Sequence, residues 1–306
     1  MHILDNILKK GKRRTKKKIQ KFNSLKCHPK HFTSKNIKRI KKSCLNDKIL
    51  NYMKIIWNKR HPDNKIISKQ PKEIWDKMNH NMNGSCSNEL CWIENTIQDT
   101  RMKNNLKKKL FAPFAPKSWK KNKDEWLSST DLLNVMKQYE DSYDHFKFFG
   151  PSPIDFNSVE YNNECVWPEI CNIDIRKLLK QHKTKLGFIF NTDKHYQDGS
   201  HWISLFVDLD KHMIFFFDSN GTKEPKEIKT FKKELQEQCL SKCGLNMKLD
   251  SNYPFEHQYK DGQCGMYCLY FIISLLKKSH NFEYFKKKRI PDKQVEKLRK
   301  IYYNQT

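Results

Sequence analysis

The chain of 306 residues lacks any long apolar run. Its longest uncharged apolar stretch, from about Met266 to Leu276, spans 11 residues and is interrupted by Ser274. A helix that crosses a membrane needs about 20 apolar residues in succession. The sequence therefore predicts no membrane span, and this stretch is better suited to a buried helix.

The N-terminus also lacks the features of a secretory signal, because charged residues follow its short apolar patch and no small-residue cleavage site is present. We therefore expect the protein to stay in a reducing compartment. The ten cysteines are then expected to be free thiols, metal ligands or a nucleophile rather than a disulfide framework. Internal repeats are lacking as well.

Acidic residues are scarce: 34 Asp and Glu stand against 60 Lys and Arg, for a net charge of +26. The excess is uneven, because residues 1–48 hold 17 Lys or Arg but only Asp5 and Asp47. So dense a block is typical of a solvated arm, which serves either as a solubilising tail or in contact with nucleic acid or another polyanion. No recognised DNA-reading motif accompanies it. We predict a basic arm over residues 1–42.

An apolar fraction of 37%, with 12% aromatic residues, is enough for a folded core. After the arm, "CLNDKILNYMKIIWNKR" and "PKEIWDKM" place apolar residues at helical spacing. The proline-marked connector "FAPFAPKSW" follows and would stop a helix. We therefore predict a small helical domain over residues 43–115 and a second domain over residues 116–306.

The second domain mixes both kinds of element. A capped helix is predicted for "SSTDLLNVMKQYEDSY", continuing into "FKFFGPSPIDF". The short aromatic and β-branched runs "LGFIFNT", "HWISLFVDL", "MIFFFDS" and "NMKLDS" indicate strands. Further helices are expected from Glu224 to Cys243, stopped by Gly244, and from Cys264 to about Lys278. A sheet flanked by helices, an α+β fold, accounts for this pattern.

Cys264 lies in a polar, glycine-flanked turn directly before the most apolar helix, in "QYKDGQCGMYCLYF". A thiol in the first turn of a helix faces unpaired amide hydrogens and the positive end of the helix dipole, and both favour the thiolate. Such a cysteine can act as a nucleophile if a base is within reach. Taken alone, a cysteine and a glycine before a helix are weak evidence for a nucleophile, and a structural cap is the better interpretation. Cys268, one helical turn later, is predicted to be buried.

His201 is the candidate base. A two-residue turn at Leu209–Asp210 would place His201 directly opposite Asp218 on the neighbouring strand, where side chains share a face. A turn at Asp210–Lys211 would make the pair diagonal but still within reach. A carboxylate in this position would orient the imidazole and stabilise its charged form. The alternative is an exposed histidine at a strand edge and an aspartate that serves only the "DSNG" turn.

Gln258 precedes Cys264 by six residues, so the loop between them can return its side-chain amide toward the sulfur. Together with the backbone N–H of Cys264, that amide could donate to a developing oxyanion. A single loop glutamine is otherwise expected to face solvent. The joint signal is the order His, Asp, Gln, Cys within one α+β half.

With these residues the chain resembles the ubiquitin-like-protein protease and adenain clan of cysteine peptidases. The likeness is carried by "HW" at 201–202, by the acidic residue in "FFFDSNG" and by "Q-x5-C-G" at 258–265. Within the clan it is similar to the core-polyprotein proteases of large DNA viruses, of the African swine fever virus type, in "LGFIFNTD", "GSHWISLFVD", "KFFGPSPIDF" and "GSCSNELCW". Two departures stand out. Asp218 replaces the asparagine of the swine fever type, and Gln263 replaces the aspartate usual in SUMO proteases.

The resemblance implies a papain-like, adenain-type catalytic domain with a mixed sheet flanked by helices. It implies peptide hydrolysis after small-residue sites such as Gly-Gly. Cys264 would attack, His201 would move the proton, Asp218 would hold His201, and Gln258 would stabilise the oxyanion. It further implies that Trp202 and Gly265 contact the substrate. A core tryptophan is the alternative reading of Trp202.

The implied substrates are viral structural or core precursors, cut in the virion and in viral factories of the host cytoplasm. Two other functions stay open: an isopeptidase that removes ubiquitin-like modifiers from host proteins, and an inactive, basic virion protein that binds nucleic acid. No cofactor and no membrane contact are expected.

Among the other cysteines, the pair Cys86 and Cys91, with His80 and the neighbouring Cys27 and His28, could bind zinc, but no second close pair completes four ligands. We therefore predict no metal site. The remaining pairs are interpreted as packing residues: Cys165 with Cys171, and Cys239 with Cys243.

Overall fold

The computed structural model describes residues 21–33, 40, 43–159 and 163–305. They divide into two compact units. The first takes the described residues within Met1–Leu25 and Lys38–Lys107, and the second those within Lys26–Ile37 and Lys108–Thr306. The division therefore falls at Lys107, eight residues before the predicted boundary.

Most of the predicted basic arm lies outside the described residues. The part of it from Lys26 onward that is described belongs to the second unit. There the Lys26 backbone N–H donates to Asn304 Oδ1 (2.6 Å), and Cys27 forms a β-bridge with Phe111. These contacts pack Lys26 and Cys27 on the second unit, so the two residues are not part of a free arm as predicted.

The first unit is helical, as predicted. Its core is formed by side chains that recur on one face of each helix, among them Met53, Ile74, Met78 and Trp92. Asn46 caps the first long helix by accepting a hydrogen bond from the Ile49 backbone N–H. The helices of this part of the chain are α2 (Asp47–Arg60), α3 (Pro71–Met82), α4 (Glu89–Thr96) and α5 (Thr100–Leu110), the last of which runs past the division between the units.

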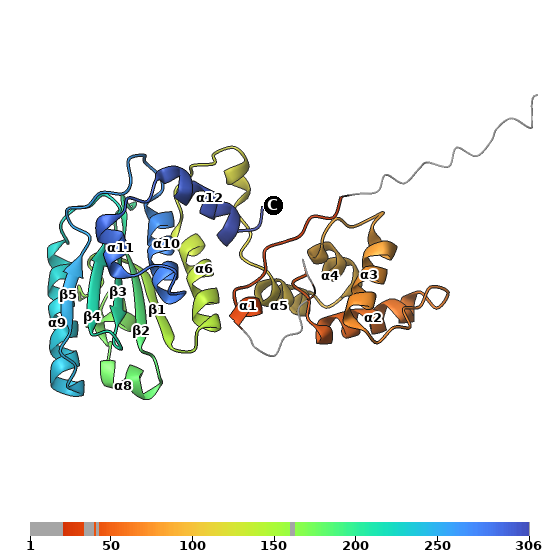
Figure 1. Cartoon of the computed structure of the whole chain (residues 1–306), viewed down its shortest axis with the longest axis horizontal. Coiled ribbons are helices and arrows are strands. Elements are labelled where there is room, and N and C mark those ends of the chain that lie inside the picture. Colours follow the sequence, from red (N-terminus) through yellow and green to blue (C-terminus); the bar gives the residue numbers. More distant parts are fainter. Residues whose placement is uncertain (1–20, 34–39, 41–42, 160–162, 306) are drawn as a thin grey trace, which may run out of the picture. The chain divides into compact units, whose positions relative to one another are not determined.

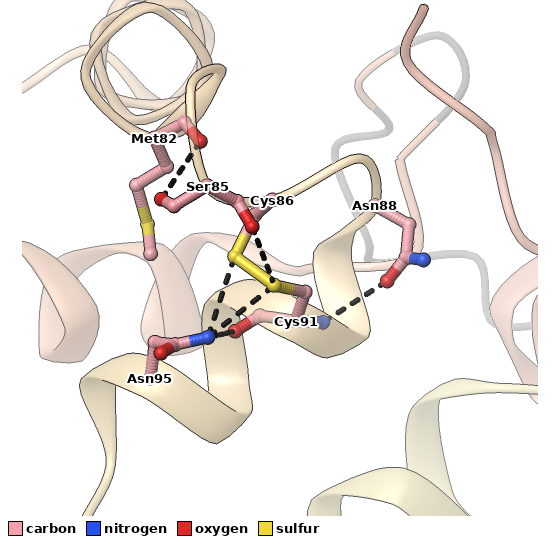
Figure 2. Close-up of a disulfide and its surroundings, with 6 residues drawn as sticks. All are labelled: Met82, Ser85, Cys86, Asn88, Cys91 and Asn95. Carbon is pink, nitrogen blue, oxygen red and sulfur yellow. Dashed lines mark hydrogen bonds between the residues drawn. A yellow bond between two sulfur atoms is a disulfide. The ribbon is translucent and has the colours of Figure 1, made fainter. Parts of the chain in front are cut away.

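A disulfide joins Cys86 to Cys91 in the turn that leads into α4 (Figure 2). Asn88 caps α4 by accepting a hydrogen bond from the Cys91 N–H (3.0 Å), and Asn95 Nδ2 faces both sulfurs from the next helical turn (3.3 and 3.4 Å). The expectation of free thiols is wrong here. Because the two sulfurs are bonded to each other, they do not form a zinc site.

The second unit is built on a five-stranded mixed sheet flanked by helices, which confirms the predicted α+β class (Figure 1). The outer pairs of strands are parallel and the inner pairs antiparallel. The strand order along the sheet is β1 (Phe146–Pro153), β2 (Lys185–Asn191), β3 (Trp202–Asp208), β4 (Met213–Phe217) and β5 (Lys248–Ser251).

Each face of the sheet has its own core, because successive side chains of a strand point to opposite faces. In β4, Phe215 and Phe217 join one cluster, whereas Ile214 and Phe216 join the other. The helices that supply the first cluster are α6 (Ser129–Ser142), α10 (Cys264–Leu276), α11 (Phe282–Lys287) and α12 (Asp292–Tyr302). Those that supply the second are α7 (Pro168–Cys171), α8 (Ile175–Lys180) and α9 (Lys226–Cys243).

Helix α6 begins as predicted but ends earlier. Ser128 and Asp131 form a reciprocal capping box at its start. The helix stops at Ser142, and the run "FKFFGPSP", predicted to continue it, is strand β1. Successive side chains of this run point to opposite faces of the sheet, as in a strand: Phe148 packs in one core and Phe149 in the other. At the far end of the unit, Gly244 ends α9 in the left-handed conformation (φ 67°), as expected.

The two cysteine pairs of the second unit that were interpreted as packing residues differ in their bonding. Cys165 and Cys171 form a second disulfide, with Cα atoms 6.5 Å apart, so their interpretation as unpaired packing residues is wrong. Cys239 is fully buried, and Cys243 packs against the same core, as predicted for packing residues. Within the described residues, no helix is both long and apolar enough to cross a membrane.

Candidate active site

Cys264 is the first residue of α10, as predicted, and the helix behind it is almost wholly buried. The side chain that precedes it, Gln263, makes no capping hydrogen bond to the helix. The amide groups of the first turn are therefore left without a side-chain cap, beside a sulfur that is 3% exposed. The buried helix fixes where that sulfur points. Cys268 is buried one turn later, and burial raises its pKa well above the usual range.

The β3–β4 hairpin brings His201 to Asp218 in the shifted register. Ser204 pairs with Phe217, and continuing this register sets Asp218 opposite Ile203, diagonal to His201. The prediction of a directly opposite pair is wrong, whereas the diagonal alternative is confirmed. The reason lies in the turn, where the Asp208 side chain accepts a hydrogen bond from the Lys211 N–H (2.9 Å).

His201 Nε2 lies 2.6 Å from Asp218 Oδ1, and Cys264 is near enough to the His201 ring to influence its pKa. Burial lowers the pKa of His201, but the hydrogen bonds and charges of Asp218 and Cys264 outweigh it and raise that pKa to about 10. Burial likewise raises the pKa of Asp218, and the hydrogen bond and charge of His201 outweigh it, so the pKa is lowered. The imidazole is therefore held as an imidazolium beside the sulfur of Cys264. A positive charge next to a cysteine favours the thiolate, which is the nucleophilic form.

Asp218 is itself fixed from several sides, and its exposed fraction is 1%. The Asn252 side chain accepts from the Asp218 N–H (2.9 Å) and donates to the Asp218 carbonyl (2.7 Å). Thr222 Oγ1 donates to one carboxylate oxygen, and the Asn220 N–H donates to the other (3.0 Å). The sequence analysis missed Asn252 and Thr222. Single polar residues in loops give no local signal of this kind.

Gln258 is buried and anchored next to Asp218. Its side-chain oxygen accepts a hydrogen bond from Ser219 Oγ (2.9 Å), and its backbone N–H donates to the Ser219 carbonyl (2.9 Å). The alternative expectation, that the Gln258 side chain faces solvent, is therefore wrong. Because the amide oxygen is engaged, the orientation of the group is fixed, and no described residue accepts a hydrogen bond from its Nε2.

Two tryptophans flank the turn that carries Cys264. Trp202 Nε1 donates to the Leu127 carbonyl (2.9 Å), and a Cβ added at Gly265 would lie 3.3 Å from the Trp202 ring. Trp126, which the sequence analysis missed, would lie 3.3 Å from a Cβ added at Gly262. Trp202 is a core residue by its burial, yet it also lines a surface cavity together with Trp126, which is 46% exposed.

That cavity has a volume of about 760 Å³ and belongs entirely to the second unit. It extends from Trp202, the neighbour of His201, to the loop around Trp167 and the segment from Asp193 to Gly199. Cys264 and His201 do not line it, and it is related to the Cys264 turn only through Trp126 and Trp202, which lie next to Gly262 and Gly265. Within the described residues, no group of three or more His, Cys, Asp or Glu side chains is arranged to hold a metal ion.

Comparison with known proteins agrees with this arrangement. Residues 175–306 match the C-terminal catalytic domain of the Ulp1 protease family. A putative thiol protease of Acanthamoeba polyphaga mimivirus is 30% identical over 247 residues, which are 79% of this chain and 75% of the relative. A cysteine protease of African swine fever virus is 24% identical over 250 residues, 78% of this chain and 90% of that relative.

The fold is similar to a crystal structure of the African swine fever virus protease, with a TM-score of 0.64 and 19% identity over 94% of this chain and 98% of that one. Fold and relatives together define a cysteine protease of viral type. The chain belongs to the Ulp1 protease family.

Proposed function

We propose that the chain is an endopeptidase that cuts viral structural or core precursors by acyl transfer at Cys264. The observation that carries the proposal is the His201–Asp218 pair (2.6 Å) beside Cys264, which together with Asp218 raises the pKa of His201. With its proton held by His201, Cys264 attacks the scissile carbonyl carbon as a thiolate, and the C–N bond breaks to leave a thioester. His201 gives its proton to the leaving amine and then takes one from the water that hydrolyses the thioester, while Asp218 holds the ring.

The oxyanion is stabilised by the Cys264 backbone N–H and by Gln258 Nε2. The contact between Ser219 and the Gln258 oxygen supports this role, because it fixes the amide and keeps its nitrogen available. A donor held in place before the reaction pays no reorganisation cost when the charge develops, and losing one typically costs about 2.7–4 kcal/mol.

The two tryptophans support the proposal that cleavage occurs after small residues. Trp126 packs on Gly262 and Trp202 on Gly265, so a large ring lies at each end of the turn that holds Cys264. Substrate residues that reach the sulfur must pass these rings, and glycines pass where larger side chains collide. The preference for a Gly-Gly type of site rests on this geometry.

The substrate class rests on the relatives. Two that cover most of the chain are viral proteases. A viral protease of this type finds its precursors in assembling particles, so we place the activity in the virion and in viral factories of the host cytoplasm.

A second candidate function is removal of ubiquitin-like modifiers from host proteins. It is favoured by the relatives from several African swine fever virus isolates that are named as SUMO-1 cysteine proteases. The chemistry at Cys264 is the same, and only the acyl donor differs. The third possibility, an inactive nucleic-acid-binding protein, is disfavoured because Cys264, His201, Asp218 and Gln258 are all present and ordered.

The test uses the full chain and its Cys264→Ala variant. Both are incubated with a purified viral core precursor, with peptides that contain Gly-Gly-Xaa, and with conjugates of SUMO and of ubiquitin, and the cut positions are read by mass spectrometry. We expect the wild type to cut the precursor and the peptides after Gly-Gly, and the variant to cut nothing while keeping its circular dichroism spectrum. Cleavage of the conjugates alone would favour the isopeptidase, and equal turnover by both proteins would exclude Cys264 as the nucleophile.

A further inference from the structure

Gln263, directly before Cys264, lies in a buried polar cluster rather than at the reacting atoms. Its exposed fraction is 1%, and its amide contacts two partners far away in the sequence. Nε2 donates to Asp124 Oδ1 (3.2 Å), and Oε1 accepts from Arg299 Nε (3.3 Å). The residue that distinguishes this chain from SUMO proteases is therefore a bridge between two elements.

Arg299, on α12, is the centre of the cluster. Its Nη2 donates to the carbonyl of Glu125 (2.6 Å) and to that of Gly262 (3.4 Å). Its guanidinium lies over the Trp119 ring, 4.5 Å from the centroid. One side chain thus holds together the segment 124–127 and the turn 262–265.

The position of Arg299 is costly for stability. It is 5% exposed, and in the described residues its hydrogen bonds go to three neutral oxygens, with Nη1 left unpartnered. Burying a guanidinium without a carboxylate incurs a desolvation penalty that neutral acceptors only partly offset. In return, the arrangement fixes the positions of the acceptor oxygens relative to one another. The planar guanidinium of an arginine does this more firmly than the single ammonium group of a lysine would.

The two joined segments form the walls beside Cys264. Glu125, whose carbonyl Arg299 holds, is followed directly by Trp126, and Gly262 contacts the Trp126 ring. The backbones approach so closely that a Cβ at Gly262 would lie 2.7 Å from the Asp124 carbonyl oxygen. A shift of either segment would therefore move Trp126 relative to the sulfur.

We propose that Arg299, acting with Gln263, is a positioning residue that sets how far Trp126 lies from the Cys264 turn and thereby enforces glycine at the cleavage site. The proposal rests on the proposed peptidase function. Arg299 does not touch the substrate. It acts through the Glu125 and Gly262 carbonyls.

The test measures kcat/KM for two peptides that differ only by Gly-Gly or Gly-Ala before the cut, with the wild type, Arg299→Met and Gln263→Met. Both Met variants should loosen the contact between the segment 124–127 and the turn 262–265. The ratio of kcat/KM for the Gly-Gly peptide to that for the Gly-Ala peptide should then fall by about tenfold, in the range that one added methyl group is worth in a pocket. Most of that change should come from a lower KM for the Gly-Ala peptide. Arg299→Lys, which keeps the charge without the fork, should recover the preference only in part.

Arg176→Met is the matched control. Arg176 also donates through Nε and Nη2 to a backbone carbonyl, that of Lys242, but between α8 and α9, away from the cavity. Its variant should keep the wild-type preference. Thermal unfolding of every variant shows which are folded at the assay temperature, and Gln263→Met serves if Arg299→Met is not.

Three outcomes bear on the proposal. In the first, Arg299→Met lowers the preference for Gly-Gly, and adding Trp126→Ala to that variant does not lower it further. This result would support action of Arg299 through Trp126. Equal losses on both peptides, with the preference unchanged, would overturn the proposal and leave Arg299 a purely structural residue. If the folded wild type cuts neither peptide, the proposed peptidase function fails first, and this inference fails with it.

Discussion

The charge on His201 is the property of a single residue on which the chemistry depends most. Its pKa is raised to about 10, although burial by itself would lower it, because Asp218 and Cys264 both favour the imidazolium. The ordinary value is 6.5. The contribution of this charge to stability is thus complete below about pH 6.5 and is lost as the pH rises through about 10. The Asp218 pKa is shifted the other way, so its contribution is lost as the pH falls below 3.8 and through the lowered value.

Replacing Asp218 with asparagine should therefore shift the alkaline limb of the pH–rate profile to lower pH, because His201 then loses its proton more easily. At pH 8 we expect kcat/KM to fall by about a hundredfold, the lower end of what a positioned acid–base group contributes. The measurement is kcat/KM on a Gly-Gly peptide from pH 5 to pH 10.

The free energy of unfolding provides a check on the same variant. Wild type and Asp218→Asn should differ most between pH 3.8 and pH 6.5, the ordinary pKa values of the two groups, where the contributions of both charges to stability are complete, and should converge toward either extreme. An alkaline limb that does not move in the variant would mean that Asp218 does not support the imidazolium.

The candidate catalytic residues Cys264, His201 and Asp218 could be picked out from the sequence because each has a local signal. Cys264 precedes a helix that is apolar on all sides, and His201 and Asp218 terminate runs that read as strands. Trp126, Asn252 and Arg299 have no such signal. Their roles arise from contacts with residues far away in the sequence, such as the contact of Arg299 with Glu125. Such contacts cannot be predicted from the type of a single residue or from its immediate neighbours.

At the scale of elements, the β3–β4 hairpin decides whether His201 and Asp218 meet. The sequence predicted both strands and left two registers open, because a turn of two residues can be placed at either of two positions. The observed pairing of Ser204 with Phe217 is fixed by the turn and by the buried alternation of both strands. Strand β1 was mistaken for helix because a short apolar run has no decisive period.

Asn252, at the end of β5, supports that hairpin through its hydrogen bonds to the Asp218 backbone. Asn252→Ala removes those two bonds and a third to the Phe255 carbonyl, and leaves buried backbone groups of Asp218 unpaired. We expect the free energy of unfolding to fall by about 2–4 kcal/mol and kcat to fall with it. Urea denaturation and steady-state kinetics measure the two effects.

Asn58→Ala is the matched control for Asn252→Ala. The Asn58 side chain makes the same paired contact with a backbone, that of Ile66, but in the first unit. It should lose stability without a comparable loss of kcat. If the two variants lose kcat equally, Asn252 has no special part in holding Asp218.

The whole molecule joins a helical unit and a catalytic unit, and carries a dense basic block at its N-terminus. Residues 1–20 hold eight Lys or Arg and lie outside the described residues. Nucleic acid contact through this block stays a prediction from composition. The disulfides Cys86–Cys91 and Cys165–Cys171, in contrast, show that a compartment inferred from a missing signal does not establish the state of individual cysteines, because the fold brings their sulfurs within bonding distance.

Deleting residues 1–20 should weaken binding to DNA and reduce its salt dependence without removing peptide cleavage. Each lost phosphate contact should lower the slope of log K against log salt concentration by about 0.9. Residues from Lys26 onward are kept, because they pack on the second unit. Fluorescence titration of a labelled duplex at several salt concentrations gives the slope, and a slope equal to that of the full chain would show that the block does not bind DNA.

The most direct test of the central claim, that Cys264 and His201 form one reactive site, is covalent labelling. A Gly-Gly vinyl sulfone peptide adds to a thiolate and can be located by mass spectrometry of the digested protein. The account predicts a single adduct at Cys264, formed at a rate that falls at least about a hundredfold in His201→Ala. Labelling of Cys243 or Cys239 in its place, or an equal rate of labelling in His201→Ala, would contradict it.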